Sequence, residues 1–199
     1  MTLSSSITSI GSYSFTNTGL TSINLNNVTS VADRAFEGCT DLQSVNSISQ
    51  LTQLGQYSFS DCHLSGMLTL NPNLTVIPSN CFARCYFTGD LVIPDNVTVL
   101  NGSCFYGIMR VQNQFSTITF GKSVNNIAYV PFSHNDNRLW VKFLSTTPPA
   151  LQNNGSLPNS NKYYVPYSSD HSTLESYKTA WPSIASKIFE LDENGNIPT

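Results

Sequence analysis

The stretch Val28-Thr-Ser-Val-Ala-Asp-Arg-Ala-Phe-Glu-Gly-Cys39 carries the pattern on which the architecture rests. Two aliphatic residues stand three positions apart, a phenylalanine follows the second by five positions, and a glycine-cysteine pair closes the stretch. The same spacing returns 23 residues later, at Leu51, Leu54 and Phe59. Self-similarity at a fixed period of this length is typical of proteins built from stacked repeats.

The phenylalanine of this pattern forms a column of six residues with spacings of 21, 23, 23, 23 and 27: Phe15, Phe36, Phe59, Phe82, Phe105 and Phe132. The aliphatic residue five positions earlier forms a second column, Ile10, Val31, Leu54, Ile77, Leu100 and Ile127. A third column lies three positions before that, at Ile7, Val28, Leu51, Leu74, Val97 and Val124. Three columns in one phase predict a solenoid, in which each coil buries its apolar edge against the next.

A second apolar stretch in each unit alternates with polar residues, as in Leu91-x-Ile93 and Val141-x-Phe143. Such alternation indicates short strands with one buried face. The outward-facing positions of these strands are Asn24, Asn46, Thr69, Val92, Thr119 and Lys142. We expect them to form a nearly flat ladder on the sheet, which is where solenoids usually bind their partners. A plainly solvated face is the alternative.

Three stretches resemble the BspA-like leucine-rich repeats of bacterial surface proteins: residues 7–15, 28–39 and 91–100. The resemblance covers about residues 7–143 and implies a β-rich, right-handed leucine-rich-repeat solenoid of about six coils. It also implies a role in surface attachment and protein binding. The sequence departs from the family pattern in two ways. The glycine after the second aliphatic residue is present only at Gly11 and Gly55, and residues 106–143 carry insertions.

The domain organisation expected from this pattern is a solenoid over 1–145, a linker loop over 146–161 and a small α/β C-terminal cap over 162–199. Residues 163–191 resemble the segment that often closes such arrays. We expect a strand over 162–165, a short helix over about 173–180 capped by Ser172 or Thr173, and a final strand over 188–191. The N-terminal coil has no such cap. We therefore expect an open apolar edge there, which is either a cut end or a surface covered by a partner or by upstream residues.

Composition limits the function. The chain has 199 residues, of which 11% are charged, and its net charge is −3, so the basic footprint of a nucleic-acid-binding protein is missing. No apolar run reaches membrane-spanning length. Serine, threonine and asparagine make up about a third of the residues, which favours an extracellular or cell-surface location, or the surface of a virion or particle. The N-terminus does not read as a signal peptide, so we expect a removed leader, another export route or a longer parent chain.

The five cysteines are spaced by the repeat and predict buried structural side chains rather than disulfides or a zinc site: Cys39, Cys62, Cys81, Cys85 and Cys104. His63, His134 and His171 lie outside the repeat columns and are expected to be loop residues. No catalytic residue, cofactor or metal site is expected from these patterns.

We therefore expect a non-enzymatic, surface-displayed module that binds a protein or glycan through its sheet face, with binding that depends little on salt. Two alternatives stay open at the level of the sequence. One is a structural spacer or a module decorating a virion or particle. The other is a carbohydrate-active β-helix enzyme, which alanine substitutions of Asp61 and Asp90 would test. The identity of the ligand does not follow from the sequence.

Overall fold

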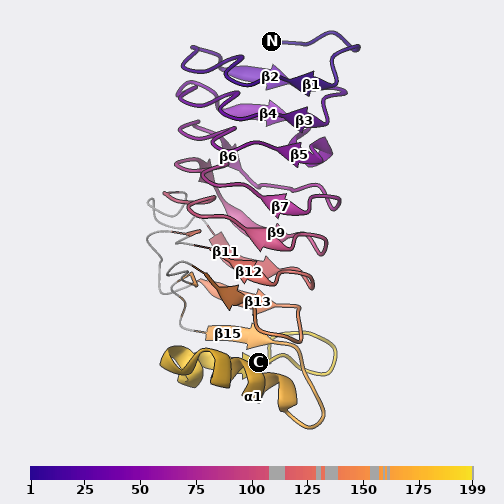
Figure 1. Cartoon of the computed structure of the whole chain (residues 1–199), viewed down its shortest axis with the longest axis vertical. Helices are drawn as coiled ribbons and strands as arrows, with labels where there is room; N and C mark the ends of the chain where they lie inside the picture. The colour runs from indigo at the N-terminus through magenta and orange to yellow at the C-terminus, as the bar shows by residue number, and fades with distance from the viewer. Residues whose placement is uncertain are drawn as a thin grey trace.

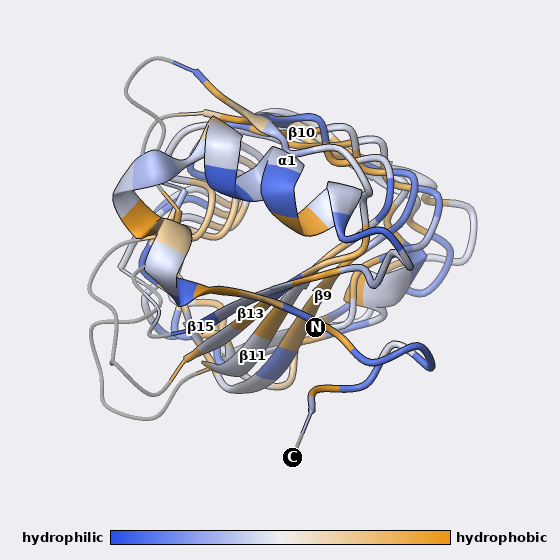
Figure 2. Cartoon of the chain, turned by 90° about the horizontal axis from the view of Figure 1, so that it is seen from below, coloured by the Kyte–Doolittle hydropathy of each residue, from blue (hydrophilic) through white to orange (hydrophobic). Residues whose placement is uncertain are grey.

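The computed structural model describes residues 1–107, 115–128, 131–132, 139–152, 157–158, 160 and 162–198. These residues wind into a stack of turns along one axis, with the N-terminus at one end and helix α1 (Ser172–Ala180) at the other (Figure 1). Viewed along that axis, each turn is a closed loop with strands on two opposite sides (Figure 2). The predicted solenoid is confirmed.

The first side of the stack carries one two-residue strand from each turn. These strands are β1 (Ser9–Ile10), β3 (Ser30–Val31), β5 (Gln53–Leu54), β7 (Val76–Ile77), β10 (Val99–Leu100), β12 (Asn126–Ile127) and β14 (Ala150–Leu151). All their pairings are parallel, in the orders β1-β3-β5 and β7-β10-β12-β14. Cα partners join equivalent residues, such as Leu100 and Ile127, so the aliphatic column lies in register along the core.

The second side carries longer strands: β2 (Ser22–Asn24), β4 (Ser44–Asn46), β9 (Gly89–Ile93), β11 (Phe115–Phe120), β13 (Trp140–Phe143), β15 (Lys162–Val165) and β16 (Ile188–Glu190). β2 pairs with β4, and β9-β11-β13-β15-β16 form a five-stranded parallel sheet. Alternate residues of β13, Val141 and Phe143, are buried, as period-2 alternation requires.

The phenylalanine column forms one continuous stack of rings. Centroids from Phe15 to Phe132 lie 5.1, 5.1, 5.7, 5.8 and 5.3 Å apart, with interplanar angles of 13° or less. The backbone of each phenylalanine turn also donates to the next turn, as from Phe59 N to Cys81 O at 2.9 Å. Side-chain stacking and backbone bonding therefore have the same period.

The stack has about seven turns in its described residues, one more than the sequence columns show. The additional turn contains β14, which pairs with β12, and β15, which pairs with β13. β14 lies inside the segment 146–161 expected as a linker. The position five residues after Leu151 is Ser156 rather than phenylalanine, so this turn lacks the residue that marks the others.

Both sheets are interrupted between the third and fourth turns, a region we call the seam. Within residues 1–107, β5 and β7 belong to different sheets, and residues 67–70 form no strand between β4 and β9. The strand expected at Leu68–Leu70 is thus replaced by irregular backbone, with Met67 72% exposed. The phenylalanine turns and the short pair β6 (Ser65–Gly66) and β8 (Tyr86–Phe87) still connect the two turns. The helical turn η1 (Ile48–Gln50) precedes the seam.

The C-terminal cap closes the hydrophobic core. Tyr177 of α1 is fully buried, and its ring centroid lies 5.5 Å from that of Phe143. Its hydroxyl donates to Ser145 O at 2.9 Å. The helix begins after His171, and the Asp170 carboxylate accepts from Ser172 N at 3.0 Å. The expectation that Ser172 or Thr173 caps the helix was therefore wrong, because Asp170 supplies the acceptor. The turn η2 (Pro182–Lys187) then leads into β16.

The N-terminal coil is partly covered by the first residues of the chain. Thr2 pairs with Asn24, and Asn24 N donates to Met1 O at 3.0 Å. These contacts cover the free edge of β2 with the chain's own backbone. Ile7 still has 37% of its surface exposed, and a partner contact at this end stays a prediction.

Replacing Phe59 by alanine removes one ring from the middle of the stack. Phe59 is fully buried between Phe36 and Phe82, so we expect the free energy of unfolding to fall by about 3–5 kcal/mol. Denaturant titration measures this change. Gln56→Ala, on an exposed side chain in the same turn, is the control and should stay within about 0.5 kcal/mol of the wild type.

Gly55 and Gly11 occupy the same repeat position and give a matched pair of alanine substitutions. A Cβ on Gly55 would lie 2.3 Å from Asp33 N in the preceding turn, whereas one on Gly11 would meet only Ser14 Oγ at 3.4 Å. We expect Gly55→Ala to destabilise the protein by about 1–3 kcal/mol through overpacking and Gly11→Ala to be nearly neutral. Equal unfolding midpoints for the two variants would contradict this account.

Candidate functional site

The outer face of the five-stranded sheet brings three of the six predicted binding residues into one row. Val92, Thr119 and Lys142 are direct Cα partners on β9, β11 and β13. The register continues beyond them to Tyr164 on β15 and Phe189 on β16. We call these five residues the outer row.

The other three predicted residues are not part of this row, although Thr69 lines the same surface pocket as Val92. Asn24 and Asn46 are partners of each other on β2 and β4, which form a separate two-stranded sheet. Thr69 lies in the irregular backbone of the seam. The ladder is thus two segments divided by the seam, because the third turn does not place its second apolar stretch in a strand.

An open apolar pocket of about 520 Å³ adjoins the outer row at the seam. Met67, Pro72, Val92 and Leu144 contribute to its lining, together with Leu70. Val92 is 55% exposed although it stands in the middle of a strand. An exposed aliphatic side chain at the rim of an apolar hollow is the kind of surface that a partner's apolar side chain can cover.

An aromatic group on the same face was missed by the sequence analysis. Trp140 is 45% exposed on β13, and its ring centroid lies 6.3 Å from that of Tyr164. Tyr164 lies 6.1 Å from Phe189, which is 41% exposed. The usable signal was the alternation itself, because Trp140 stands two residues before Lys142 and so shares its face.

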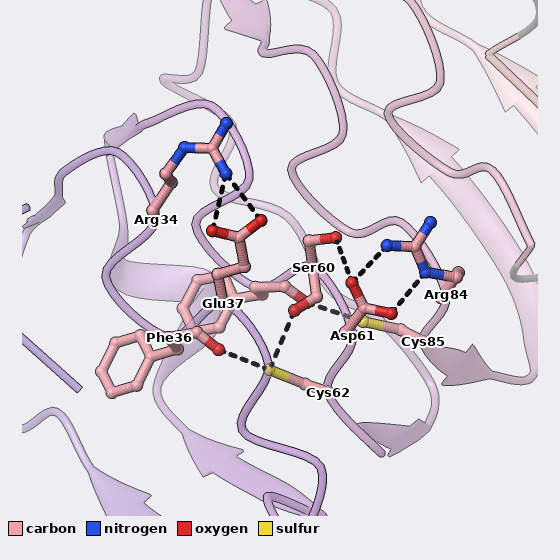
Figure 3. A network of polar contacts seen from close by, with 9 residues as sticks. Arg34, Phe36, Glu37, Ser60, Asp61, Cys62, Arg84 and Cys85 are labelled. Atoms are coloured by element: carbon pink, nitrogen blue, oxygen red, sulfur yellow. Dashed lines mark hydrogen bonds and ion pairs between the residues drawn. The ribbon is translucent and has the colours of Figure 1, made fainter. Parts of the chain in front are cut away.

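The turns around Phe36, Phe59 and Phe82 carry a network of polar contacts (Figure 3). Arg34 donates from Nη1 to both oxygens of the Glu37 carboxylate at 2.7 Å. Arg84 donates from Nε and Nη2 to the two carboxylate oxygens of Asp61 in the preceding turn. The hydrogen bonds from Arg84 hold the pKa of Asp61 below its usual value. A carboxyl held in its charged form is poorly suited to act as a general acid.

The enzyme alternative would be tested at Asp61 and Asp90, which the structure places apart in role and setting. Asp61 is held by Arg84 in the phenylalanine turn, whereas Asp90 lies exposed on β9. Among the described residues, no group of three or more His, Cys, Asp and Glu side chains is arranged to hold a metal ion. His63 contacts the Tyr86 ring edge-on and His171 contacts Glu190 at 2.5 Å, while His134 lies outside the described residues.

The cysteines are free and buried, as the repeat spacing predicted. In three successive turns the thiol donates to the carbonyl of the phenylalanine one turn earlier: Cys39 to Phe15 at 2.8 Å, Cys62 to Phe36 at 3.1 Å and Cys85 to Phe59 at 3.2 Å (Figure 3 shows Cys62 and Cys85). Burial raises the pKa of Cys62, Cys85 and Cys104 well above the usual range and that of Cys81 to about 12. Cys39, Cys62 and Cys85 thus link adjacent turns, and Cys81 contacts Ser58 of the preceding turn at 3.1 Å.

The geometry defines a class of protein: a repeat solenoid with a regular apolar core and one extended sheet face. The BspA type leucine rich repeat region matches in six copies across residues 8–139, so the chain belongs to this family. No curated protein matches the sequence. None of the described helices is long and apolar enough to cross a membrane.

Two solved structures resemble this one in fold. The first is a leucine-rich repeat protein from Bacteroides ovatus, with 16% identity and a TM-score of 0.53 over 94% of this chain and 65% of the other. The second is the pneumococcal vaccine antigen PcpA, with 16% identity and a TM-score of 0.45 over 100% of this chain and 41% of the other. The chain thus spans about two thirds of the first protein and two fifths of the second.

The buried thiols should be unreactive in the folded protein. The cysteine thiolate attacks the disulfide of the reagent and releases the chromophore, so burial and, for the four cysteines with a raised pKa, the low thiolate population both suppress the reaction. We expect the folded protein to release almost no chromophore from Ellman's reagent at pH 8 over an hour, and the protein unfolded in guanidinium to react at all five cysteines. Ser12→Cys adds a thiol at an exposed position and serves as the reactive control. Rapid labelling of the wild type would show that the turns open readily.

Proposed function

We propose that the chain is a non-enzymatic recognition module that binds a protein partner through the outer face of its five-stranded sheet. The observation that carries this proposal is the outer row, which continues in register across β9, β11, β13, β15 and β16. It presents exposed apolar side chains, Val92 and Phe189, at its two ends. Apolar and aromatic groups on a rigid surface are the usual anchors of protein interfaces.

The rigidity of this face comes from the core beneath it. Leu91, Ile118 and Val141 stand next to the outer row in their strands, and each is almost fully buried. Parallel partners on both sides hold the backbone of β11, β13 and β15. A surface fixed in this way loses little conformational entropy when a partner binds, so weak contacts add up to useful affinity.

We further propose display at a cell surface or on a particle, where such a module would mediate adhesion. The low content of charged residues, 11%, and the abundance of serine, threonine and asparagine suit an extracellular surface. The family's occurrence in bacterial surface proteins supports the same setting. A partner bound at the exposed N-terminal coil belongs to this proposal, since Ile7 stays open to solvent there.

The outer face can be tested by charge substitution at Val92, at one end of the outer row, and at its neighbour Thr119. A partner is first isolated by chemical cross-linking in the protein's native setting and then purified. We expect Val92→Lys and Thr119→Arg to weaken its binding at least about tenfold, because each places a charge inside the buried contact. Gln53→Lys, on exposed β5 of the opposite sheet, is the matched control and should change the affinity less than twofold. The outer face is refuted as the binding surface if all three variants lose affinity equally, or if none of them loses affinity.

A further inference from the structure

Two lysines on the outer face have no counter-charge among the residues that the structure describes. Of the seven lysines and arginines in the described residues, four form ion pairs with carboxylates, as Arg34 does with Glu37. Lys187 donates to Ser160 O at 3.3 Å. Within the same residues, the ammonium groups of Lys142 and Lys162 make neither an ion pair nor a hydrogen bond.

These two lysines are neighbours in the sheet. Lys142 is the Cα partner of Tyr164, and Lys162 is the Cα partner of Trp140, so both point outward from adjacent strands. The acid on this face, Asp90, stands on β9, two strands away from β13, which is about 10 Å. In a chain with a net charge of −3, this corner of the face is a local concentration of positive charge.

The aromatic group fills the space between the lysines. Tyr164 is buried, at 3% exposure, and its ring lies between those of Trp140 and Phe189. The Lys162 ammonium lies 5.8 Å above the Phe189 ring. We call the five residues Trp140, Lys142, Lys162, Tyr164 and Phe189 the aromatic-lysine cluster. Its exposed surface is therefore apolar rings bordered by two cations.

We propose that the aromatic-lysine cluster binds an acidic, apolar segment of a protein partner. An aliphatic or aromatic side chain of that segment packs on the exposed rings of Trp140 and Phe189, and carboxylates on either side of it pair with Lys142 and Lys162. This inference rests on the proposed function and specifies the chemistry of the partner. It differs from the expectation that binding depends little on salt, because an exposed ion pair is screened by salt.

The ring geometry favours a peptide over a sugar. Stacking of a pyranose uses a flat aromatic platform, but the Trp140 and Tyr164 rings are inclined by 58° and the Tyr164 and Phe189 rings by 40°. The Lys162 ammonium also occupies one face of Phe189. Tilted rings form an uneven apolar surface, which suits branched or aromatic side chains.

The probe is a fluorescein-labelled hexapeptide in which glutamate alternates with phenylalanine and leucine. A second peptide, with glutamine in place of each glutamate, is compared with it. Fluorescence anisotropy should show at least tenfold tighter binding of the acidic peptide, and this preference should shrink as salt rises from 20 to 500 mM. Lys142→Gln combined with Lys162→Gln should abolish the preference for the acidic peptide. Trp140→Ala should weaken the binding of both peptides. Lys122→Gln combined with Lys178→Gln removes two charges outside the aromatic-lysine cluster and is the charge-matched control.

Equal binding of the acidic and glutamine peptides would overturn the proposal, as would no binding of either. Tighter binding of an acidic oligosaccharide such as a tetragalacturonate would also overturn it, in favour of a glycan ligand. Circular dichroism checks that each variant is folded. If the peptide experiment fails while Val92→Lys still blocks the purified partner, this inference is wrong and the proposed function stands. If Val92→Lys and Thr119→Arg leave that partner's binding unchanged, the proposed function itself is wrong.

Discussion

Each turn of this protein leaves an apolar edge that only another turn can cover, and the whole structure depends on that constraint. The phenylalanine turn satisfies it in two ways at once. The ring stacks on its counterpart about one strand spacing away, and the backbone N–H donates to a carbonyl of the next turn. Cysteine adds a third link, from its thiol to the phenylalanine carbonyl of the preceding turn. Because all three links share one period, the turns cannot slip against each other without losing every link.

Much of the architecture could be predicted because this constraint determines which residue types occur and how they are spaced along the sequence. Phe36, Phe59 and Phe82 occupy one column in the sequence and one stack in space. The buried cysteines followed from the same period. The prediction was weaker where a turn lacks the marker residue. β14 lies in a turn without the phenylalanine, so the pattern alone did not show that the ladder continues through Ala150 and Leu151.

The candidate site was harder to predict than the core, for a physical reason. Core positions are restricted to apolar residues, whereas outer positions tolerate almost any side chain, so the sequence indicates which residues face outward but not what they form together. Alternation placed Val92, Thr119 and Lys142 on one face correctly. It did not reveal that Tyr164 and Phe189 extend the same row, because those residues belong to the cap rather than to a repeat. The cap therefore seals the core and enlarges the outer face.

The seam is the place where the solenoid bends most easily. A stack whose strands are bonded on both sides resists bending in every direction, but between the third and fourth turns neither sheet is continuous in the described structure. Only the phenylalanine turns and the β6-β8 pair carry backbone bonds across it. The slowest collective motion of the molecule should therefore be a rocking of the first three turns against the rest, with the phenylalanine side as the pivot. Amide protons of residues 67–70 should exchange with solvent faster than those of β11 or β13, since no strand partner protects them.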